Sequence, residues 1–260
     1  FRPLILSRHP SHSILRAKNQ TLPLLPFRSV IRLGSSTESD GRLEINTTEA
    51  VKNSASKLLM KQKFTEAGVK TAKWCEYGKI DFINDKGILF DRENEEVDIP
   101  FPLVAKSHFG SRGVGNTKFN TEEELEAWLP GKNLNNYIFE AFCKMTREYR
   151  LHITKFGCFY TCRKLVKNDA PEGTWQKHDD VCNWVLEENP SFKKPKNWDA
   201  IVADCIKAKD ALGLDICAFD VGVQGAKDGV ERENPEWIIF ESCSAASFGN
   251  VTGQKYIEIL

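Results

Sequence analysis

A short apolar segment ends in a lysine and continues directly into a glycine-rich loop, and this pairing constrains the chain more than any other feature. Residues 103–106 read Leu-Val-Ala-Lys, and the loop that follows contains Gly110, Gly113 and Gly115. Glycines let backbone N–H groups come close to ligand oxygens, and a lysine supplies a point charge, so the combination suits a polyphosphate. A glycine-rich hairpin without a ligand has the same local pattern, so the remaining motifs must decide between the two interpretations.

Size and charge limit the classes of protein to which the chain can belong. It has 260 residues, 41% of them hydrophobic, and its formal net charge is zero. This length suits one large domain or two to three small ones, and the composition excludes general disorder. A neutral chain has no global field that attracts nucleic acid or an anionic membrane, so we expect neither partner, and any anion site must be built locally.

The cysteines and the lengths of the apolar segments bear on location. Most of the eight cysteines lie inside apolar runs, as Cys217 does, which is typical of reduced, buried thiols in a cytoplasmic protein. No apolar stretch is as long as a membrane span, and the start of the sequence lacks the apolar core of a signal peptide, so we expect neither. The basic stretch from Arg2 to Arg32 contains one Phe, Phe27, and lacks a series of aromatic platforms between its basic residues, so a nucleic-acid interface there is a disfavoured alternative.

Apolar periodicity and turn residues predict an α+β fold. Gly68 and Gly213 follow helical patterns and predict helix ends, and Thr121 precedes three acids as a helix cap does. The predicted strands lie near residues 4–6, 29–33, 72–77, 87–90, 103–107, 136–142, 147–155, 157–166, 216–223 and 237–242, and the predicted helices near 47–50, 54–67, 121–128, 198–212 and 255–260.

The segment 167–197 has no clear periodicity and is rich in turn-forming and charged residues. A long loop in a compact domain is often a functional lid. We expect its first half to contact an acceptor substrate through Trp175, Lys177 and His178, and to become ordered when that substrate binds.

Two carboxylates stand inside apolar strands near the end of the chain. Asp220 lies within residues 217–223, and Glu241 lies at the end of 237–241. A buried charge is costly unless it is paired or bound to a metal, so each acid could simply meet an arginine or a lysine. Two consecutive strands can also pair as a hairpin, which would bring both carboxylates to one Mg²⁺ bound with a nucleotide phosphate.

Taken in order, these motifs resemble those of the ATP-grasp superfamily over about residues 46–255. The resemblance includes a lysine-bearing helix before Gly68, the strand and loop at 103–115, a hinge at 137–142, the strand at 147–153 and the two acids. It implies two α/β subdomains that clasp ATP: a short N-terminal α/β segment at 1–45, a first subdomain with the phosphate-clasping hairpin at 46–142, and a second with the metal and catalytic residues at 143–260.

The resemblance also implies a role for each matching residue, although each one taken singly could be an ordinary surface or strand-edge charge. For the nucleotide, the implied roles are phosphate contacts from Lys57, Lys106, Ser111 and the backbone at Gly113, adenine contacts from the backbone of Glu140, Phe142 or Cys143, and a ribose contact from Glu148. The implied Mg²⁺ ligands are Asp220 and Glu241. The implied catalytic residue at the transferred phosphoryl group is Arg163, with Lys164 as helper.

The implied activity is ATP-dependent carboxylate–amine ligation through an acyl phosphate, on an amino acid or peptide, with ATP and Mg²⁺ as cofactors. Residues 147–150 resemble the peptide-ligase branch and, more loosely, ATP-grasp proteins of tailed phages. One position departs from the family pattern, because Cys243 stands where the family has an asparagine, and a thiol is a poor Mg²⁺ ligand. The alternative is therefore a catalytically degenerate ATP-binding module. The sequence leaves the donor, the acceptor and the oligomeric state open.

Overall fold

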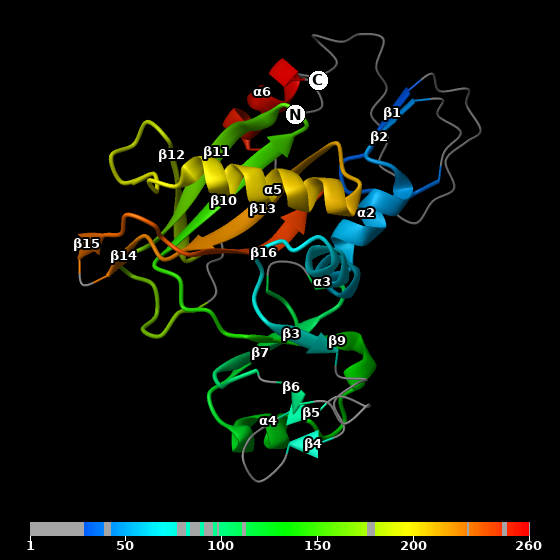
Figure 1. The fold of residues 1–260 in the computed structure, drawn as a ribbon, viewed down its shortest axis with the longest axis vertical. Helices are drawn as coiled ribbons and strands as arrows, with labels where there is room; N and C mark the ends of the chain where they lie inside the picture. The colour runs from blue at the N-terminus through cyan, green and yellow to red at the C-terminus, as the bar shows by residue number, and fades with distance from the viewer. Residues whose placement is uncertain are drawn as a thin grey trace.

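Two antiparallel sheets form the framework of the computed structural model, which describes residues 29–38, 43–76, 82–83, 89–90, 96–97, 99–110, 113–175, 180–227, 229–245 and 249–259 (Figure 1). The larger sheet has five strands and the smaller has four. In spatial order the larger contains β12 (Cys182–Leu186), β11 (Gly157–Val166), β10 (Arg147–Thr154), β13 (Ile216–Val223) and β16 (Trp237–Cys243), and the smaller contains β3 (Trp74–Glu76), β9 (Tyr137–Ala141), β7 (Leu103–Ser107) and β8 (Asn116–Phe119).

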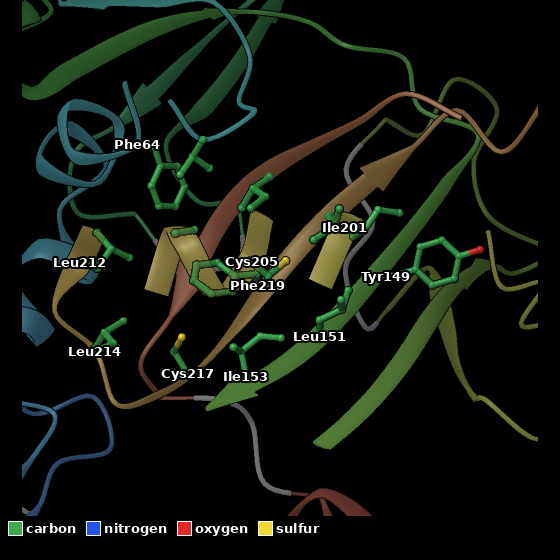
Figure 2. Close-up of a cluster of buried hydrophobic side chains, with 14 of the residues drawn as sticks. Phe64, Tyr149, Leu151, Ile153, Ile201, Cys205, Leu212, Leu214, Cys217 and Phe219 are labelled. Carbon is green, nitrogen blue, oxygen red and sulfur yellow. The ribbon is translucent and has the colours of Figure 1, made fainter. Parts of the chain in front are cut away.

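Helix α5 (Trp198–Leu212) covers one face of the large sheet and builds the main core with it. Side chains alternate between the faces of a strand, and in β10 Tyr149, Leu151 and Ile153 all point into this core (Figure 2). Gly213 ends α5 with a φ of 74°, the left-handed conformation that glycine adopts at helix C-termini.

The opposite face of the large sheet carries polar side chains and is covered at one end by α6 (Asn250–Ile259). His152 on β10 is buried there, and its Nδ1 lies 3.0 Å from the hydroxyl of Tyr256 on α6. The polar part of this face, further along β10 and β13, is therefore left for the site described below.

Helices α2 (Thr48–Ala55) and α3 (Lys57–Glu66) correspond to the two helices expected near 47–50 and over 54–67, with the boundary between them at Ser56. Ser56 separates the two helices, because its backbone is extended and its hydroxyl accepts a hydrogen bond from the Leu59 amide as the N-cap of α3. Phe64 packs on Phe219 of β13, with ring centroids 6.3 Å apart. These helices open the predicted 46–142 subdomain, yet their buried side chains belong to the core of the large sheet.

The small sheet has its own core. Helix α4 (Glu122–Trp128), capped by Thr121 as expected, packs Leu125 and Trp128 against β8 and β9. Trp128 makes edge contacts with the rings of Phe119, Tyr137 and Phe139. The remaining described elements are the 3₁₀ turn η2 (Leu134–Asn136), the parallel pair β1 (Ser29–Ile31) and β2 (Leu43–Ile45), the hairpin β14 (Ala226–Lys227) and β15 (Val230–Glu231), and a three-stranded sheet of β4 (Phe82–Ile83), β5 (Leu89–Phe90) and β6 (Glu96–Val97).

Most predicted elements are confirmed. The bounds of β7, β11, β13 and α5 match the prediction, and β13 and β16 pair as the expected hairpin. The prediction of a loop over 167–197 was wrong in one part, because β12 forms within this segment as an edge strand on β11. The strand predicted at 4–6 lies outside the described residues. In the part of the chain that the structure describes, every helix is too short or too polar to cross a bilayer.

Candidate functional site

The glycine-rich loop begins directly after β7, whose last residues include Lys106. Gly110 is required by a close approach, since a Cβ there would lie 2.4 Å from the carbonyl oxygen of Val114. Gly113 has a φ of 71° in the turn that leads into β8, a conformation that other residues rarely adopt. Ser111, expected to contact phosphate, lies outside the described residues. The hairpin is built as the sequence predicts, with Lys106 opposite Asn116 at its base.

Lys57, the first residue of α3, joins this loop to the large sheet. Its backbone amide donates to the His108 carbonyl at 2.9 Å, and its Nζ donates to the Gly110 carbonyl at 2.5 Å. The same Nζ lies 4.0 Å from Oε2 of Glu241 on β16. Burial lowers the pKa of Lys57, and Glu241 offsets part of this effect.

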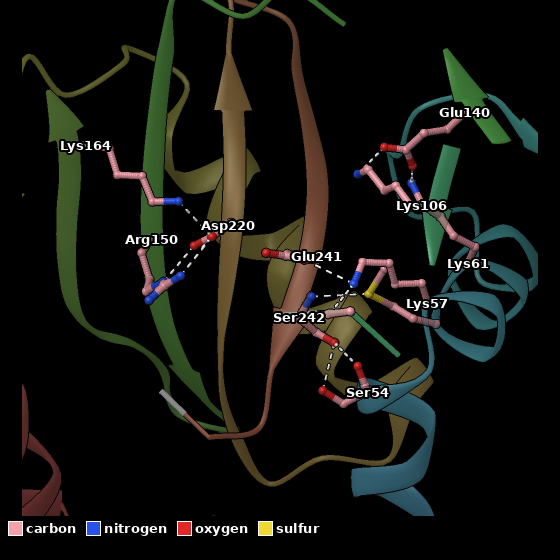
Figure 3. A network of polar contacts seen from close by, with 12 residues as sticks. Ser54, Lys57, Lys61, Lys106, Glu140, Arg150, Lys164, Asp220, Glu241 and Ser242 are labelled. Atoms are coloured by element: carbon pink, nitrogen blue, oxygen red, sulfur yellow. Dashed lines mark hydrogen bonds and ion pairs between the residues drawn. The ribbon is translucent and has the colours of Figure 1, made fainter. Parts of the chain in front are cut away.

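A buried carboxylate on β9 is shared between two lysines. Glu140 Oε1 pairs with Lys106 Nζ, and Glu140 Oε2 lies 2.7 Å from Lys61 Nζ (Figure 3). Burial alone would raise the pKa of Glu140, but the two ammonium groups outweigh it and hold that pKa below its usual value. Glu140 therefore contributes its side chain, and not only the expected backbone, to the site.

Sequence reasoning missed Lys61. The signal that could have found it is its spacing: it stands four residues after Lys57, on the same face of the helix, between the buried residues Met60 and Phe64. A lysine at a buried position of a helix needs an acidic partner, and the sequence alone does not indicate that this partner is Glu140.

A second buried carboxylate organises the large sheet. Asp220 on β13 accepts two hydrogen bonds from the Arg150 guanidinium (Figure 3): Nε donates to Oδ1 at 2.7 Å, and Nη2 donates to Oδ2 at 2.8 Å. Lys164 Nζ on β11 lies 3.0 Å from the same Oδ2 and also pairs with Glu148. These four side chains come from three adjacent strands and share one face of the sheet.

Ion pairing fixes the protonation states of this second cluster. Burial opposes the charge on Asp220, yet Arg150 and Lys164 overcome it and lower the pKa of the carboxyl well below its usual range. Burial also opposes the charges on Arg150 and Lys164, and Asp220 in turn raises the pKa of both. The acid and its two cations are therefore all ionised at neutral pH.

Arg163, expected to face the transferred phosphoryl group, is not part of this cluster. Neighbouring residues of a strand point to opposite faces, so Arg163 points away from the face that Lys164 occupies. Its Nη1 donates to the carbonyls of Ser191 and Phe192, at 2.6 and 3.2 Å, on the side of the α5 core. Of the two cations expected to act in catalysis, only Lys164 lies beside Asp220.

The expected adenine hinge is partly engaged within the protein. The backbone of Glu140 lies inside the small sheet, paired with both β3 and β7, and the Phe142 amide donates to the Pro102 carbonyl at 2.9 Å. The Phe142 ring makes an edge contact with Trp175, with ring centroids 6.0 Å apart, and the Nζ of Lys118 lies 4.3 Å from the centroid of the Phe142 ring. Trp175 thus joins the expected acceptor loop to the hinge, whereas Lys177 and His178 lie outside the described residues.

The donor set fits one Mg²⁺ shared with phosphates. Asp220 and Glu241 are opposite each other in the register of β13 and β16, and Mg²⁺ in nucleotide sites is typically held by one or two carboxylates with phosphate oxygens and water. No group of three His, Cys, Asp or Glu side chains suited to a metal occurs within the described ranges. Burial raises the pKa of the Cys243 thiol, so it stays protonated and is a poor ligand.

The charges of the two clusters leave an excess of positive charge. The basic members are Lys57, Lys61, Lys106, Arg150 and Lys164, and the acidic members are Glu140, Glu148, Asp220 and Glu241. A set of five cations with four carboxylates, in a chain of zero net charge, is suited to an anion that brings its own divalent metal.

Comparison with known proteins finds matches in structure alone. The chain matches no protein-family profile and no curated protein by sequence. D-alanine–D-alanine ligase from Bacillus anthracis, in complex with ATP, aligns with a TM-score of 0.54 and 16% identity over 82% of this chain and 65% of that one. A second structure of this ligase gives 0.53 and 17%, over 77% and 60%. N5-carboxyaminoimidazole ribonucleotide synthetase from Thermus thermophilus gives 0.52 and 16%, over 78% and 48%.

These likenesses establish the fold. The chain has an ATP-grasp fold of the α+β class, as the sequence motifs predicted. It spans less than two thirds of the length of these solved proteins. Because one fold hosts many activities, what those proteins bind is a separate question for this chain.

Proposed function

We propose that the chain is an ATP-dependent carboxylate–amine ligase of the cytoplasm, which binds ATP and Mg²⁺ and acts on an amino acid or a peptide. The observation that carries this proposal is the convergence of Lys57 and Lys106 with the Asp220 cluster, from two sheets and a helix, around an excess of positive charge. The fold supports it, since the solved neighbours include D-alanine–D-alanine ligase with bound ATP.

In this proposal the lysines of the small-sheet side hold the polyphosphate. Lys106 and Lys57 contact α- and β-phosphate oxygens, and the loop around Gly113, together with Ser111, closes over the β- and γ-phosphates. Lys57 would exchange its bond to the Gly110 carbonyl for a phosphate oxygen, which couples loop position to nucleotide binding. Cys143 supplies the backbone contact to adenine, since the Phe142 amide already has a partner.

On the large-sheet side, Asp220 and Glu241 would hold Mg²⁺, which neutralises charge on the phosphate oxygens when bound. Arg150 fixes the orientation of Asp220 through two parallel hydrogen bonds. Glu148 pairs with Lys164 and would also accept hydrogen bonds from the ribose hydroxyls.

The proposed reaction transfers the γ-phosphoryl group to a substrate carboxylate, which forms an acyl phosphate and releases ADP. An amine then attacks the carbonyl carbon, loses a proton and displaces phosphate. Lys164, in place of the expected Arg163, would neutralise the negative charge that develops on the transferred group. No protein nucleophile is needed, because the phosphate is the leaving group and the residues act by charge and position.

A catalytically degenerate ATP-binding module is the second candidate, and two observations favour it. Both oxygens of Asp220 already accept hydrogen bonds from cations, and Cys243 offers a protonated thiol where the family has an amide oxygen. Such a protein would bind ATP and release no phosphate.

A phosphate-release screen tests the proposal. The full chain is incubated with ATP, Mg²⁺ and a panel of amino acids and peptides, and calorimetry measures ATP binding in parallel. We expect release that requires both a carboxylate and an amine, and that is lost in Asp220→Asn. Binding without release across the panel would support the degenerate module. Absence of ATP binding by the folded wild type would refute both.

A further inference from the structure

Lys61 is the most deeply buried charge of the site, and the proposed function above gives it no role. Its side chain is 1% exposed, so a nucleotide that enters from solvent cannot reach its ammonium group in this structure. Its Nζ lies 2.7 Å from Glu140 Oε2 and donates to the Thr71 hydroxyl at 2.5 Å. Any influence on a ligand must therefore pass through these partners.

Glu140 is the route from Lys61 to the phosphate side of the site. Each oxygen of this carboxylate takes one ammonium group, Lys61 on Oε2 and Lys106 on Oε1. Two cations that share one anion leave a net positive charge, whereas Glu140 with Lys106 alone would form a neutral pair. The Lys106 side chain is 12% exposed, so the remaining charge is presented on the side that solvent reaches.

Thr71 connects Lys61 to the other sheet. The Thr71 hydroxyl donates to the carbonyl of Ile239 at 3.0 Å, and the Ile239 amide donates to the Lys70 carbonyl at 2.8 Å. Ile239 lies on β16, two residues before Glu241. Lys61 therefore connects two sheets (Figure 3): β16 of the large sheet, which carries Glu241, and β7 and β9 of the small sheet, which carry Lys106 and Glu140.

We propose that Lys61 is a positioning residue for the phosphate site: by sharing Glu140 with Lys106, it prevents the carboxylate from neutralising Lys106 and aims that ammonium group at the nucleotide phosphates. This inference rests on the proposed binding of ATP. If Lys61 acts in this way, its effect on phosphate binding requires the Glu140 carboxylate. A residue that only stabilises the fold would have no such requirement.

A double-mutant cycle on the full chain tests the inference, with Kd values measured by calorimetry for ATP and for adenosine. The variants are Lys61→Met, Glu140→Gln and the two combined, with Lys63→Met as a control on the exposed side of the same helix. We expect Lys61→Met to weaken ATP binding about tenfold and to change adenosine binding less than about twofold, because the neutral pair no longer attracts phosphate. In the Glu140→Gln background, the same substitution should weaken ATP binding by less than about threefold.

The combined variant keeps the test decisive if Lys61→Met alone does not fold. Replacement of both members of a buried ion pair by neutral groups of similar shape is often tolerated, so we expect it to fold with a thermal midpoint close to that of Glu140→Gln. A tenfold loss of ATP affinity when Lys61→Met is added to Glu140→Gln would overturn the inference, as would equal losses for ATP and adenosine. Failure of the wild type to bind ATP would instead remove the proposed function, and this inference with it.

Discussion

The two sheets each contain one buried carboxylate held by two cations, and the two clusters differ in balance. Asp220 is held by Arg150 and Lys164, and Lys164 also meets Glu148, so two cations face two acids. Glu140 is the acid in direct ion-pair contact with Lys61 and Lys106 among the described residues, and Glu241 and Glu148 act on Lys106 from farther away. The Asp220 cluster is therefore neutral by itself, and the Glu140 cluster is positive.

The clusters also differ in how they are built. The Asp220 cluster lies within one sheet, on three strands whose register brings its members together. The Glu140 cluster joins β7 and β9 of the small sheet to α3, which packs in the core of the large sheet. The Asp220 cluster, built within one sheet, is therefore suited to fix a metal and a reacting group, whereas the geometry of the Glu140 cluster depends on how the small sheet is positioned against α3.

Asp220→Asn is expected to have the largest effect of any single substitution in the two clusters. The substitution removes one metal ligand and leaves Arg150 and Lys164 with less negative charge, so we expect turnover to fall about a thousandfold, or roughly 4 kcal/mol in activation free energy. Phosphate release measures the effect. Asp199→Asn, an exposed acid at the start of α5, is the matched control and should change turnover less than about twofold. Equal losses in both variants would show that the Asp220 cluster has no special role.

Acid should destabilise the large-sheet side through His152. Burial, together with Arg150, lowers the pKa of His152 to about 3, so the folded protein keeps the ring neutral while the unfolded chain protonates it below about pH 6.5. The unfolded state then binds more protons, and stability falls as the pH falls from 6.5 toward 3, by about 3 kcal/mol at pH 4.

Urea unfolding at pH 7, 5.5 and 4 measures this dependence. His152→Asn keeps a group that can bond to the Tyr256 hydroxyl and does not titrate, so its stability should fall less steeply with pH. Parallel profiles for the variant and the wild type would contradict the assignment to His152.

Lys106→Met tests whether the Glu140 cluster binds the phosphates of ATP and not its adenosine part. It removes an ammonium group of the positive cluster, so we expect ATP affinity to fall about thirtyfold, or roughly 2 kcal/mol, while adenosine affinity changes little. Calorimetry measures both, and Lys132→Met, an exposed lysine after α4, is the control. A loss that is the same for adenosine would mean that Lys106 supports the fold and does not bind phosphate.

The smallest expected effect concerns Cys243, which lies on the strand next to Asp220. Cys243→Asn provides a hard amide oxygen in place of a thiol, so we expect turnover to rise about threefold and the Mg²⁺ concentration for half-maximal rate to fall. A Mg²⁺ titration of phosphate release checks this. Lost turnover would indicate that the thiol belongs to a specialised site.

The sequence predicted the secondary-structure elements of the fold more completely than the arrangement of the site residues. Apolar runs with clear ends, such as residues 103–107 and 216–223, gave strands with the expected bounds, because a buried strand needs little beyond local composition and alternation. The strand Cys182–Leu186 was missed, since it lies in a polar segment that is rich in turn-forming residues and is stabilised by pairing with β11. The two helices predicted near 47–50 and 54–67 both form, but their boundary lies at Ser56, later than predicted, because the residues on either side of Ser56 continue a helical pattern.

By itself, the sequence determined which chemical groups are available and in what order, and this order is enough to predict the ATP-grasp fold that the solved structures confirm. Tertiary structure alone decided that Lys164 and not Arg163 meets Asp220, and that Lys61 shares Glu140 with Lys106. The physical reason is that adjacent cations on a strand point to opposite faces, and only the packing of α5 on one face determines which face is left for the site. In the same way, the buried Lys61 is paired with Glu140 on β9, which is distant in sequence, and the local sequence pattern around Lys61 does not specify this partner.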